Sequence, residues 1–171
     1  MKLFHVSEEQ DIKNFIPRYS SRINQSVVWA ISENKLANYL LPRDCPRIAY
    51  CAGKNTLEMD KKHFLGASHQ VVAIENKWYK KATTTTLYLY ELPDCAFSLF
   101  DAIAGYYTTE RTVTPIHKQI INTPIKELLS RNIEVRIMPC LWKLYDAVVD
   151  STLEFSIIRM KNARLRMRSH H

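Results

Sequence analysis

The amino-acid sequence predicts an α+β fold with mixed, mostly antiparallel sheet structure and four or five helices. Short runs of β-branched, aromatic and aliphatic residues recur along the 171-residue chain, as expected of strands. Between some of these runs lie segments whose apolar residues recur at helical spacing. The two kinds of segment do not alternate regularly, so a doubly wound parallel sheet is not expected.

Seven to nine segments are predicted to form strands, because each is rich in apolar or β-branched residues and is bounded by polar or proline-containing stretches. The candidates are 3–6, 27–31, 48–51, 70–74, 87–92, 106–109, 113–121, 134–138 and 153–158. The threonines at 83–86 indicate the beginning of the strand at 87–92. Pro115 interrupts 113–121, so this strand is expected at a sheet edge or with a bulge.

Helices are predicted where a capping residue precedes apolar residues at helical spacing. The candidates are 8–16, 32–41, 76–81, 123–131 and 141–149, with a less regular helical turn at 97–105. Ser7 is the expected N-cap of the first helix, which has Glu8 and Glu9 in its first turn. Asn132 suits a left-handed cap at the end of the helix that begins near Pro124.

The length suits one globular domain, and no repeat or linker interrupts the chain, so residues 1–167 are expected to form a single domain. Residues 168–171 read Arg-Ser-His-His and resemble the remnant of a purification tag. No apolar run reaches the length of a membrane span, and acidic residues follow the start too early for a signal peptide. A cytoplasmic protein with reduced cysteines is therefore expected.

No motif in the sequence identifies a reaction or a metal site. A Walker loop, a dinucleotide glycine fingerprint, a zinc-protease helix and a nucleophile elbow are all missing, and the chain has only three glycines. Cys45 and Cys51, followed by His63 and His69, are spaced differently from the ligands of a zinc finger. Candidate functional residues must therefore be sought one by one.

The first candidate is His5, at the end of the first predicted strand. An imidazole at a strand end can hydrogen-bond to a phosphate, a ribose hydroxyl or a carbonyl group. The alternative is that His5 only satisfies a backbone carbonyl at the edge of the core.

The second candidate is a set of arginines in or near proline-containing turns: Arg18, Arg22 and Arg43. A guanidinium group in a stiff turn is suited to bind phosphate or carboxylate with two hydrogen bonds. The alternative is that Asp44 pairs with one of these arginines and the turn is structural, since surface charges usually lie in water.

The third candidate is the short extended piece at 106–111. Tyr106 and Tyr107 can stack on a planar ring, and Glu110 can orient a ribose hydroxyl or act as a base. The alternative is that the tyrosines pack in the core and that Glu110 and Arg111 are ordinary charges of a turn. Functional residues concentrate on such loops at the ends of strands, which keeps both interpretations open.

Several stretches of the chain are similar to a bacterial family of uncharacterised proteins of comparable length, a domain of unknown function. They are LFHVSEE at 3–9, DI at 11–12, FIPR at 15–18, VVWAI at 27–31, YLLPRDCPR at 39–47, AGYY at 104–107, VTP at 113–115 and STLEFS at 151–156. The resemblance extends over nearly the whole chain. It implies no activity, because the family has none assigned.

A second resemblance concerns the fold. A histidine on the first strand, the stretch Phe15-Ile16-Pro17-Arg18 and an apolar strand leading into a helix resemble the front half of ADP-ribosyltransferase-like domains. This resemblance implies an NAD-dependent ADP-ribosyl- or phosphotransferase-like enzyme that needs no metal. The second-strand tyrosine of that superfamily is not reproduced, since the strand here reads VVWAI.

Each candidate residue then has an implied role. His5 would hold the ribose, Arg18 and Arg43 the pyrophosphate, Tyr106 or Tyr107 the nicotinamide ring, and Glu110 would be the catalytic acid. Two alternatives stay open. One is a non-catalytic module that binds RNA or a protein, with RNA bound through the lysine pairs at 61–62 and 80–81 and a basic C-terminal tail. The other is a structural protein without a small ligand.

Overall fold

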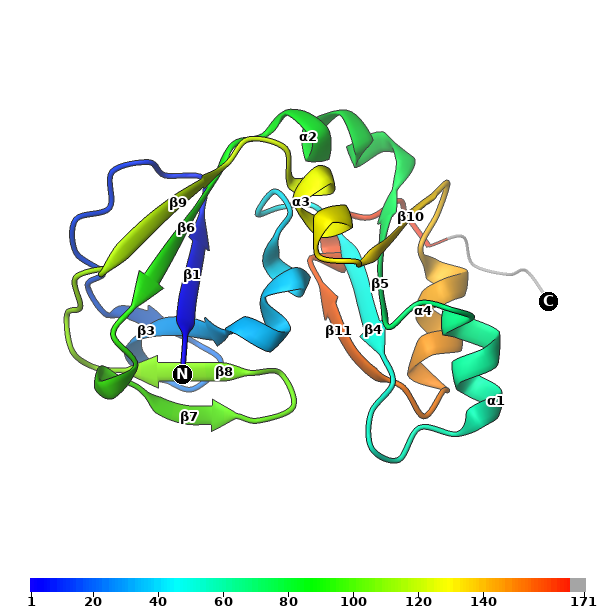
Figure 1. Cartoon of the computed structure of the whole chain (residues 1–171), viewed down its shortest axis with the longest axis horizontal. Coiled ribbons are helices and arrows are strands. Elements are labelled where there is room, and N and C mark those ends of the chain that lie inside the picture. Colours follow the sequence, from blue (N-terminus) through cyan, green and yellow to red (C-terminus); the bar gives the residue numbers. More distant parts are fainter. Residues whose placement is uncertain (167–171) are drawn as a thin grey trace. The chain divides into compact units, whose positions relative to one another are not determined.

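The computed structural model describes residues 1–166 and confirms the predicted α+β fold, with two sheets that are mostly antiparallel (Figure 1). The chain divides into two compact units. Unit 1 comprises residues 1–43 and 85–124, and unit 2 comprises residues 44–84 and 125–171. The single domain expected over 1–167 stays a prediction. The residues interpreted as a tag remnant, 168–171, lie outside the described part of the chain.

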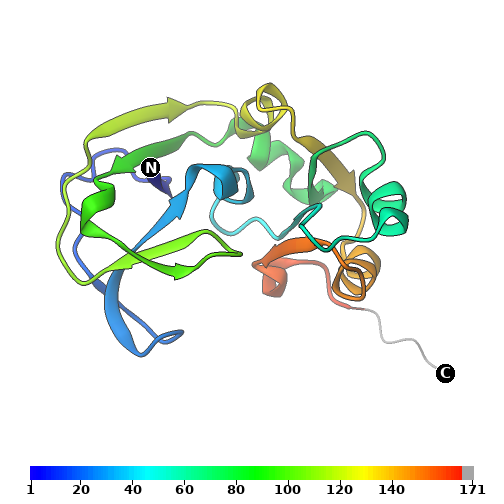
Figure 2. The same cartoon turned by 60° about the horizontal axis from the view of Figure 1, so that its bottom comes forward.

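Unit 1 is built around a seven-stranded sheet whose strand pairs are all antiparallel. Its path runs β7-β8-β3-β1-β6-β9, and β2 also pairs with β3. The strands can be followed by colour in Figure 2, from the blue N-terminal strands to the yellow-green β9. Their bounds are β1 Leu3–Ser7, β2 Arg18–Ser20, β3 Gln25–Ser32, β6 Leu87–Leu92, β7 Ser98–Asp101, β8 Tyr106–Thr109 and β9 His117–Ile121. A 3-10 helix, Glu33–Tyr39, follows β3.

Side chains alternate across this sheet, and one of its faces carries the core of unit 1. Val28 and Ala30 of β3 pack there with Leu3 and Tyr90, together with Phe15 from the segment after β1. Pairing of the edge strand β9 with β6 begins only at His117, beyond Pro115, as the proline predicted.

The helix predicted at 8–16 is wrong: the segment is extended and irregular. Its polar backbone groups have partners outside a helix. The buried Tyr90 hydroxyl group donates to the carbonyl oxygens of Glu9 and Gln10, at 2.8 and 2.5 Å, and accepts from the amide of Ile12 at 3.2 Å. Because a tertiary partner takes these groups, local helix capping does not decide the conformation.

Two other local predictions in unit 1 are corrected. The segment 97–105 contains strand β7 and a turn, because the Asp101 carboxylate accepts the amide N–H groups of Ile103 and Ala104 and thereby closes a hairpin onto β8. The segment between Pro17 and β3, which is not among the predicted strands, contains the short strand β2. Asn24, with φ of 53°, provides the left-handed residue of that hairpin turn.

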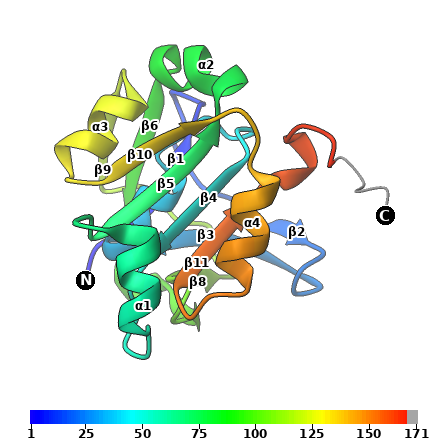
Figure 3. The ribbon, with the colours of Figure 1, turned by 90° about the vertical axis from the view of Figure 1, so that its right-hand side faces the viewer.

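Unit 2 is built around a four-stranded mixed sheet of order β10-β5-β4-β11. Only β10 and β5 run parallel. The strands are β4 Arg47–Cys51, β5 Gln70–Glu75, β10 Glu134–Met138 and β11 Glu154–Ile158. The helices are α1 Glu58–Asp60, which continues as a π-helix Lys61–Leu65, then α2 Tyr79–Thr84, α3 Pro124–Ser130 and α4 Trp142–Val149. Figure 3 shows α1 and α4 in front of this sheet.

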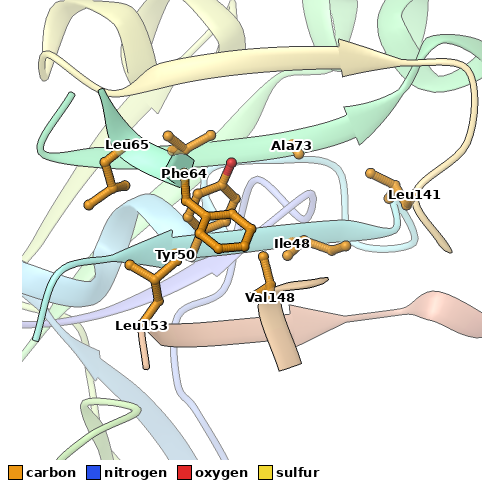
Figure 4. Close-up of a cluster of buried hydrophobic side chains, with 9 residues drawn as sticks. Ile48, Tyr50, Phe64, Leu65, Ala73, Leu141, Val148 and Leu153 are labelled. Carbon is orange, nitrogen blue, oxygen red and sulfur yellow. The ribbon is translucent and has the colours of Figure 1, made fainter. Parts of the chain in front are cut away.

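The core of unit 2 lies between the sheet and these helices (Figure 4). Ile48 and Tyr50 of β4 meet Phe64 of the π-helix and Val148 of α4. Each fully buried aliphatic side chain in such a core contributes about 1.5–3 kcal/mol. The continuous apolar runs at 48–51 and 70–74 predicted these two central strands correctly.

The sequence predicted the end of α3 correctly and the end of α2 incorrectly. Asn132 has φ of 60°, which confirms the predicted left-handed cap after α3. By contrast, the prediction that a strand begins at Thr83 is wrong, because α2 continues to Thr84. The hydroxyl groups of Thr83 and Thr84 donate to the carbonyl oxygen of Lys80 at 2.9 Å, so both threonines are accommodated in the helix. No helix within residues 1–166 has the length and apolar character needed to cross a membrane.

Candidate functional site

His5 reaches β3 at a point between two strand pairings. Strand β1 pairs with Ile31 and Ser32, whereas β2 pairs with residues 25–27. Trp29 lies between these pairings, and its carbonyl oxygen is 3.0 Å from Nδ1 of His5. The His5 ring also packs on Phe15, with 4.8 Å between ring centroids. The imidazole therefore has a defined orientation where β1 leaves β3.

This contact also defines which nitrogen of His5 carries the proton. A carbonyl oxygen can only accept a hydrogen bond, so Nδ1 is the donor and Nε2 of the neutral ring keeps its lone pair. Burial lowers the pKa of His5 below its usual value, the hydrogen bond to Trp29 raises it in part, and the positive charges of Arg43 and Arg18 lower it again. The ring is accordingly neutral at pH 7 and offers Nε2 as an acceptor or a base.

Arg18 and Arg43 approach His5 from different segments, and their charges act on its ring. Arg18 is the first residue of β2 and pairs with Val27, two residues before Trp29. The amide of Arg43 donates to the Glu8 carboxylate at 2.8 Å, which ties the turn at Arg43 to the residues just after β1. Both arginine side chains are exposed. Three of the predicted site residues are thus brought together, and we call them the His5 site.

Tyr106 and Tyr107 point to opposite faces of the sheet, because neighbouring residues of a strand alternate. Tyr107 packs against the core of unit 1. Tyr106 lies on the other face, where its ring centroid is 5.4 Å from that of Trp29 and its hydroxyl group contacts the hydroxyl of Tyr39. Of the two tyrosines, Tyr106 is therefore the one placed outside the core.

Glu110 is exposed and follows the last residue of β8. Its neighbour Thr109 pairs with Val28, while Arg18 pairs with Val27. Glu110 and Arg18 are thus attached near the same point of β3. No hydrogen bond or ion pair joins Glu110 to the other site residues within residues 1–166.

A cluster around Arg22 was missed by the sequence analysis, which named Arg22 only as one of the candidate arginines. The Arg22 guanidinium carbon lies 5.0 Å from the ring centroid of Tyr106, 5.9 Å from that of Trp29 and 5.8 Å from that of Phe100. Asp101 is its counter-ion at 3.9 Å. Strand alternation could have revealed this cluster: Val28 and Ala30 face the core, so Trp29 between them must face the other way.

Among the cysteines, buried Cys45 is unsuited to nucleophilic chemistry. All four are free thiols, as expected, and burial raises the pKa of Cys45 to about 12. A thiol with such a pKa is protonated and unreactive at neutral pH. Within residues 1–166, no three histidine, cysteine or carboxylate side chains gather as they would around a metal ion.

Comparison with known proteins gives one match. A family model described as "Family of unknown function (DUF6886)" matches residues 4–163. No curated protein and no solved structure matches the chain. The expected resemblance to a family of unknown function is confirmed over most of the chain, whereas the ADP-ribosyltransferase-like assignment stays a prediction.

Proposed function

Because the chain belongs to the DUF6886 family, whose function is unknown, we propose a function from its geometry: unit 1 binds a phosphorylated nucleotide at the His5 site. One observation carries this proposal. A neutral histidine, oriented by its hydrogen bond to the Trp29 carbonyl oxygen, lies within the electrostatic reach of Arg18 and Arg43.

The three side chains match the groups of a nucleotide. Nε2 of His5 accepts a hydrogen bond, which a ribose hydroxyl can donate. Arg18 and Arg43 are exposed guanidinium groups that can each bind a phosphate oxygen pair. Water solvates both arginines in the free protein, so their approach to the phosphates contributes steering and orientation more than affinity.

In its finer form the proposal takes NAD as the ligand and ADP-ribosyl or phosphoryl transfer as the reaction. Tyr107 is the better candidate for the nicotinamide end, because it lies on the face of the sheet that carries His5, whereas Tyr106 lies on the opposite face. Glu110 would orient the ribose 2′-hydroxyl and stabilise the cationic sugar that forms when the glycosidic bond breaks. Arg22 covers part of the Tyr106 ring and would have to move for a ring to stack there.

A thermal-shift titration tests the binding. The full chain is heated with NAD, ADP-ribose, ATP or a short RNA, and the same series is run on His5→Ala and on the double variant Arg18→Ala/Arg43→Ala. A ligand at ten times its Kd stabilises the folded state by about 1.4 kcal/mol, or roughly 3–6 °C in Tm for a chain of this size. We expect NAD or ADP-ribose to give this shift in the wild type and to lose it in both variants.

Two control variants accompany the titration. His117→Ala removes an exposed histidine on the edge strand β9, and Arg111→Ala removes an exposed arginine of the same unit. Both should keep the full shift. Absence of any nucleotide shift at millimolar concentration, or a shift that survives in the arginine double variant, would refute the proposal. Loss of NAD turnover in Glu110→Gln with binding retained would support the transferase form, and unchanged turnover would contradict it.

A further inference from the structure

We propose that unit 2 carries a second binding surface, specific for single-stranded nucleic acid and separate from the His5 site. It consists of basic side chains from two segments, 76–84 and 160–166. We call it the basic surface; its members are Lys77, Lys80, Lys81, Lys161, Arg164 and Arg166. The inference does not depend on the nucleotide proposal, because it concerns the other unit.

The distribution of charge between the units is the first observation. Unit 1 contains eight lysines and arginines and eight aspartates and glutamates, so its formal net charge is zero. Unit 2, counted to residue 166, contains fifteen basic and nine acidic residues, a net charge of +6. The basic character of the chain therefore resides in unit 2 alone. A basic excess concentrated on one part of a protein attracts polyanions.

The second observation is that the fold joins the two basic segments. Nζ of Lys77 donates to the carbonyl oxygen of Asn162 at 3.0 Å, and both carboxylate oxygens of buried Glu75 accept the amide N–H of Arg164, at 3.0 and 3.1 Å. On the other side, Nε1 of Trp142 donates to the carbonyl oxygen of Arg164 at 2.6 Å. The C-terminal segment thus lies against the segment 76–84 and α4, and Figure 3 shows it in red beside α4.

Two of the acidic groups at this surface form ion pairs with its cations, whereas Asp44, whose carbonyl oxygen accepts from Asn162, is exposed. Glu75 is fully buried, and Lys77 forms an ion pair with it at 3.3 Å. Asp146 forms an ion pair with Arg166 at 2.7 Å. Lys80, Lys81 and Lys161 are exposed to water. The exposed cations of the surface therefore outnumber its exposed carboxylates, Asp44 and Asp146.

Aromatic rings are interleaved with these cations. Nζ of Lys81 lies 5.5 Å from the ring centroid of Trp78, and the guanidinium carbon of Arg166 lies 5.2 Å from that of Trp142. Tyr79 is half exposed. Proteins that bind single strands combine backbone-neutralising cations with aromatic rings on which bases stack. A surface that serves only solubility has no need of this combination.

Fluorescence anisotropy with a labelled 15-nucleotide oligo-uridine and the full chain tests the proposal. If four cations of the basic surface engage phosphates, the logarithm of the association constant falls against the logarithm of the salt concentration with a slope of about −3. Between 50 and 200 mM KCl this is a loss of roughly fifty-fold. A slope near zero, or no binding at 50 mM KCl, would overturn the proposal.

A matched pair of variants separates this surface from general attraction to a basic protein. Lys80→Ala/Lys81→Ala removes two members of the basic surface and should reduce the slope by about 1.4. Lys61→Ala/Lys62→Ala removes the same charge from the π-helix and should leave most of the binding intact. Equal losses in the two variants would refute a localised surface.

The test also distinguishes this proposal from the one for unit 1. Lys80→Ala/Lys81→Ala should keep the nucleotide thermal shift, and Arg18→Ala/Arg43→Ala should keep RNA binding. Loss of RNA binding in the Arg18→Ala/Arg43→Ala variant would overturn the assignment to unit 2. Because these lysines and arginines are exposed, we expect the variants to fold as the wild type does, which circular dichroism verifies.

Discussion

Tyr90→Phe removes a single buried oxygen atom that holds the segment after β1 in place. The side chain is 1% exposed, and its ring meets Phe15 edge-on at 5.3 Å. Its hydroxyl group donates to the carbonyl oxygens of Glu9 and Gln10 and accepts a hydrogen bond from the amide of Ile12. Phenylalanine keeps the ring packing and loses only these hydrogen bonds.

The hydroxyl group has one proton, so it donates one hydrogen bond at a time and accepts another. Each net hydrogen bond contributes about 0.5–1.5 kcal/mol, so the loss is about 1–3 kcal/mol. Glu9 and Gln10 are exposed, and water can replace part of what their carbonyl oxygens lose. We therefore expect about 1–2 kcal/mol, which is roughly 2–8 °C in Tm for a chain of this size.

Urea denaturation and limited trypsin digestion measure this effect together. Exposed Lys13 follows the segment that Tyr90 holds, so its cleavage reports local opening. The expected loss of stability corresponds to about 5–30-fold faster cleavage after Lys13. Tyr79→Phe, at a half-exposed tyrosine of unit 2, is the control. An unchanged urea midpoint together with unchanged cleavage in Tyr90→Phe would refute the role assigned to its hydroxyl group.

Three further predictions concern both units. Unfolded His5 has a higher pKa than the buried ring, so acid favours unfolding. Below pH 6.5 the free energy of unfolding of the wild type should fall relative to that of His5→Gln by up to about 1.4 kcal/mol per pH unit. Urea denaturation at several pH values measures this, and an equal pH dependence in the two proteins would contradict it. Gly105→Ala should cost more than about 1 kcal/mol in thermal unfolding, because φ is +71° and a Cβ atom would collide with neighbouring side chains. Gly66→Ala, with φ of +57° and ψ of −114° in open space, measures backbone strain without a collision, and a Gly105→Ala loss no larger than the Gly66→Ala loss would exclude the collision. Arg136 donates to Glu134, to the Tyr50 hydroxyl and to a backbone carbonyl, so Arg136→Ala should lower the free energy of unfolding in urea by about 2–3 kcal/mol. Arg136→Lys should recover only part of this loss, and full recovery would show that charge alone matters.

Predictions from local pattern succeeded where burial is continuous along the chain. The apolar runs at 48–51 and 70–74 became the central strands β4 and β5, since a strand buried on both faces has few polar positions. Asn132 became a left-handed cap because its short side chain tolerates positive φ. In these places local preference and tertiary burial favour the same conformation.

Predictions failed where a distant group competes for the backbone. Ser7 with two following glutamates is typical of a helix start, yet Tyr90, about eighty residues away, takes the carbonyl groups of that segment. Residues 97–105 were expected to pack from a helical turn, yet the pairing of β7 with β8 gives their backbone a sheet partner. No property of the local sequence encodes these partners.

The candidate site shows the same division. His5, Arg18 and Arg43 could be named from the sequence, because their residue types and strand-end positions suit an anionic ligand. Their proximity could not, since it depends on β1 separating from β3 near Trp29 and on β2 pairing beside it. The Arg22 cluster was missed for a different reason: alternation separates Trp29 from Val28 and Ala30, but only the structure shows that Val28 and Ala30 face the core.

The sequence by itself determined the α+β class, most of the strands and the chemical types of the candidate residues, because hydrophobic periodicity and capping act over a few neighbouring positions. The tertiary structure alone decided the division into two units, the neutral form of His5 and the joining of the basic segments of unit 2. Each of these depends on contacts between residues far apart in the chain, and the free energy of such contacts is set by burial and geometry that no local pattern contains.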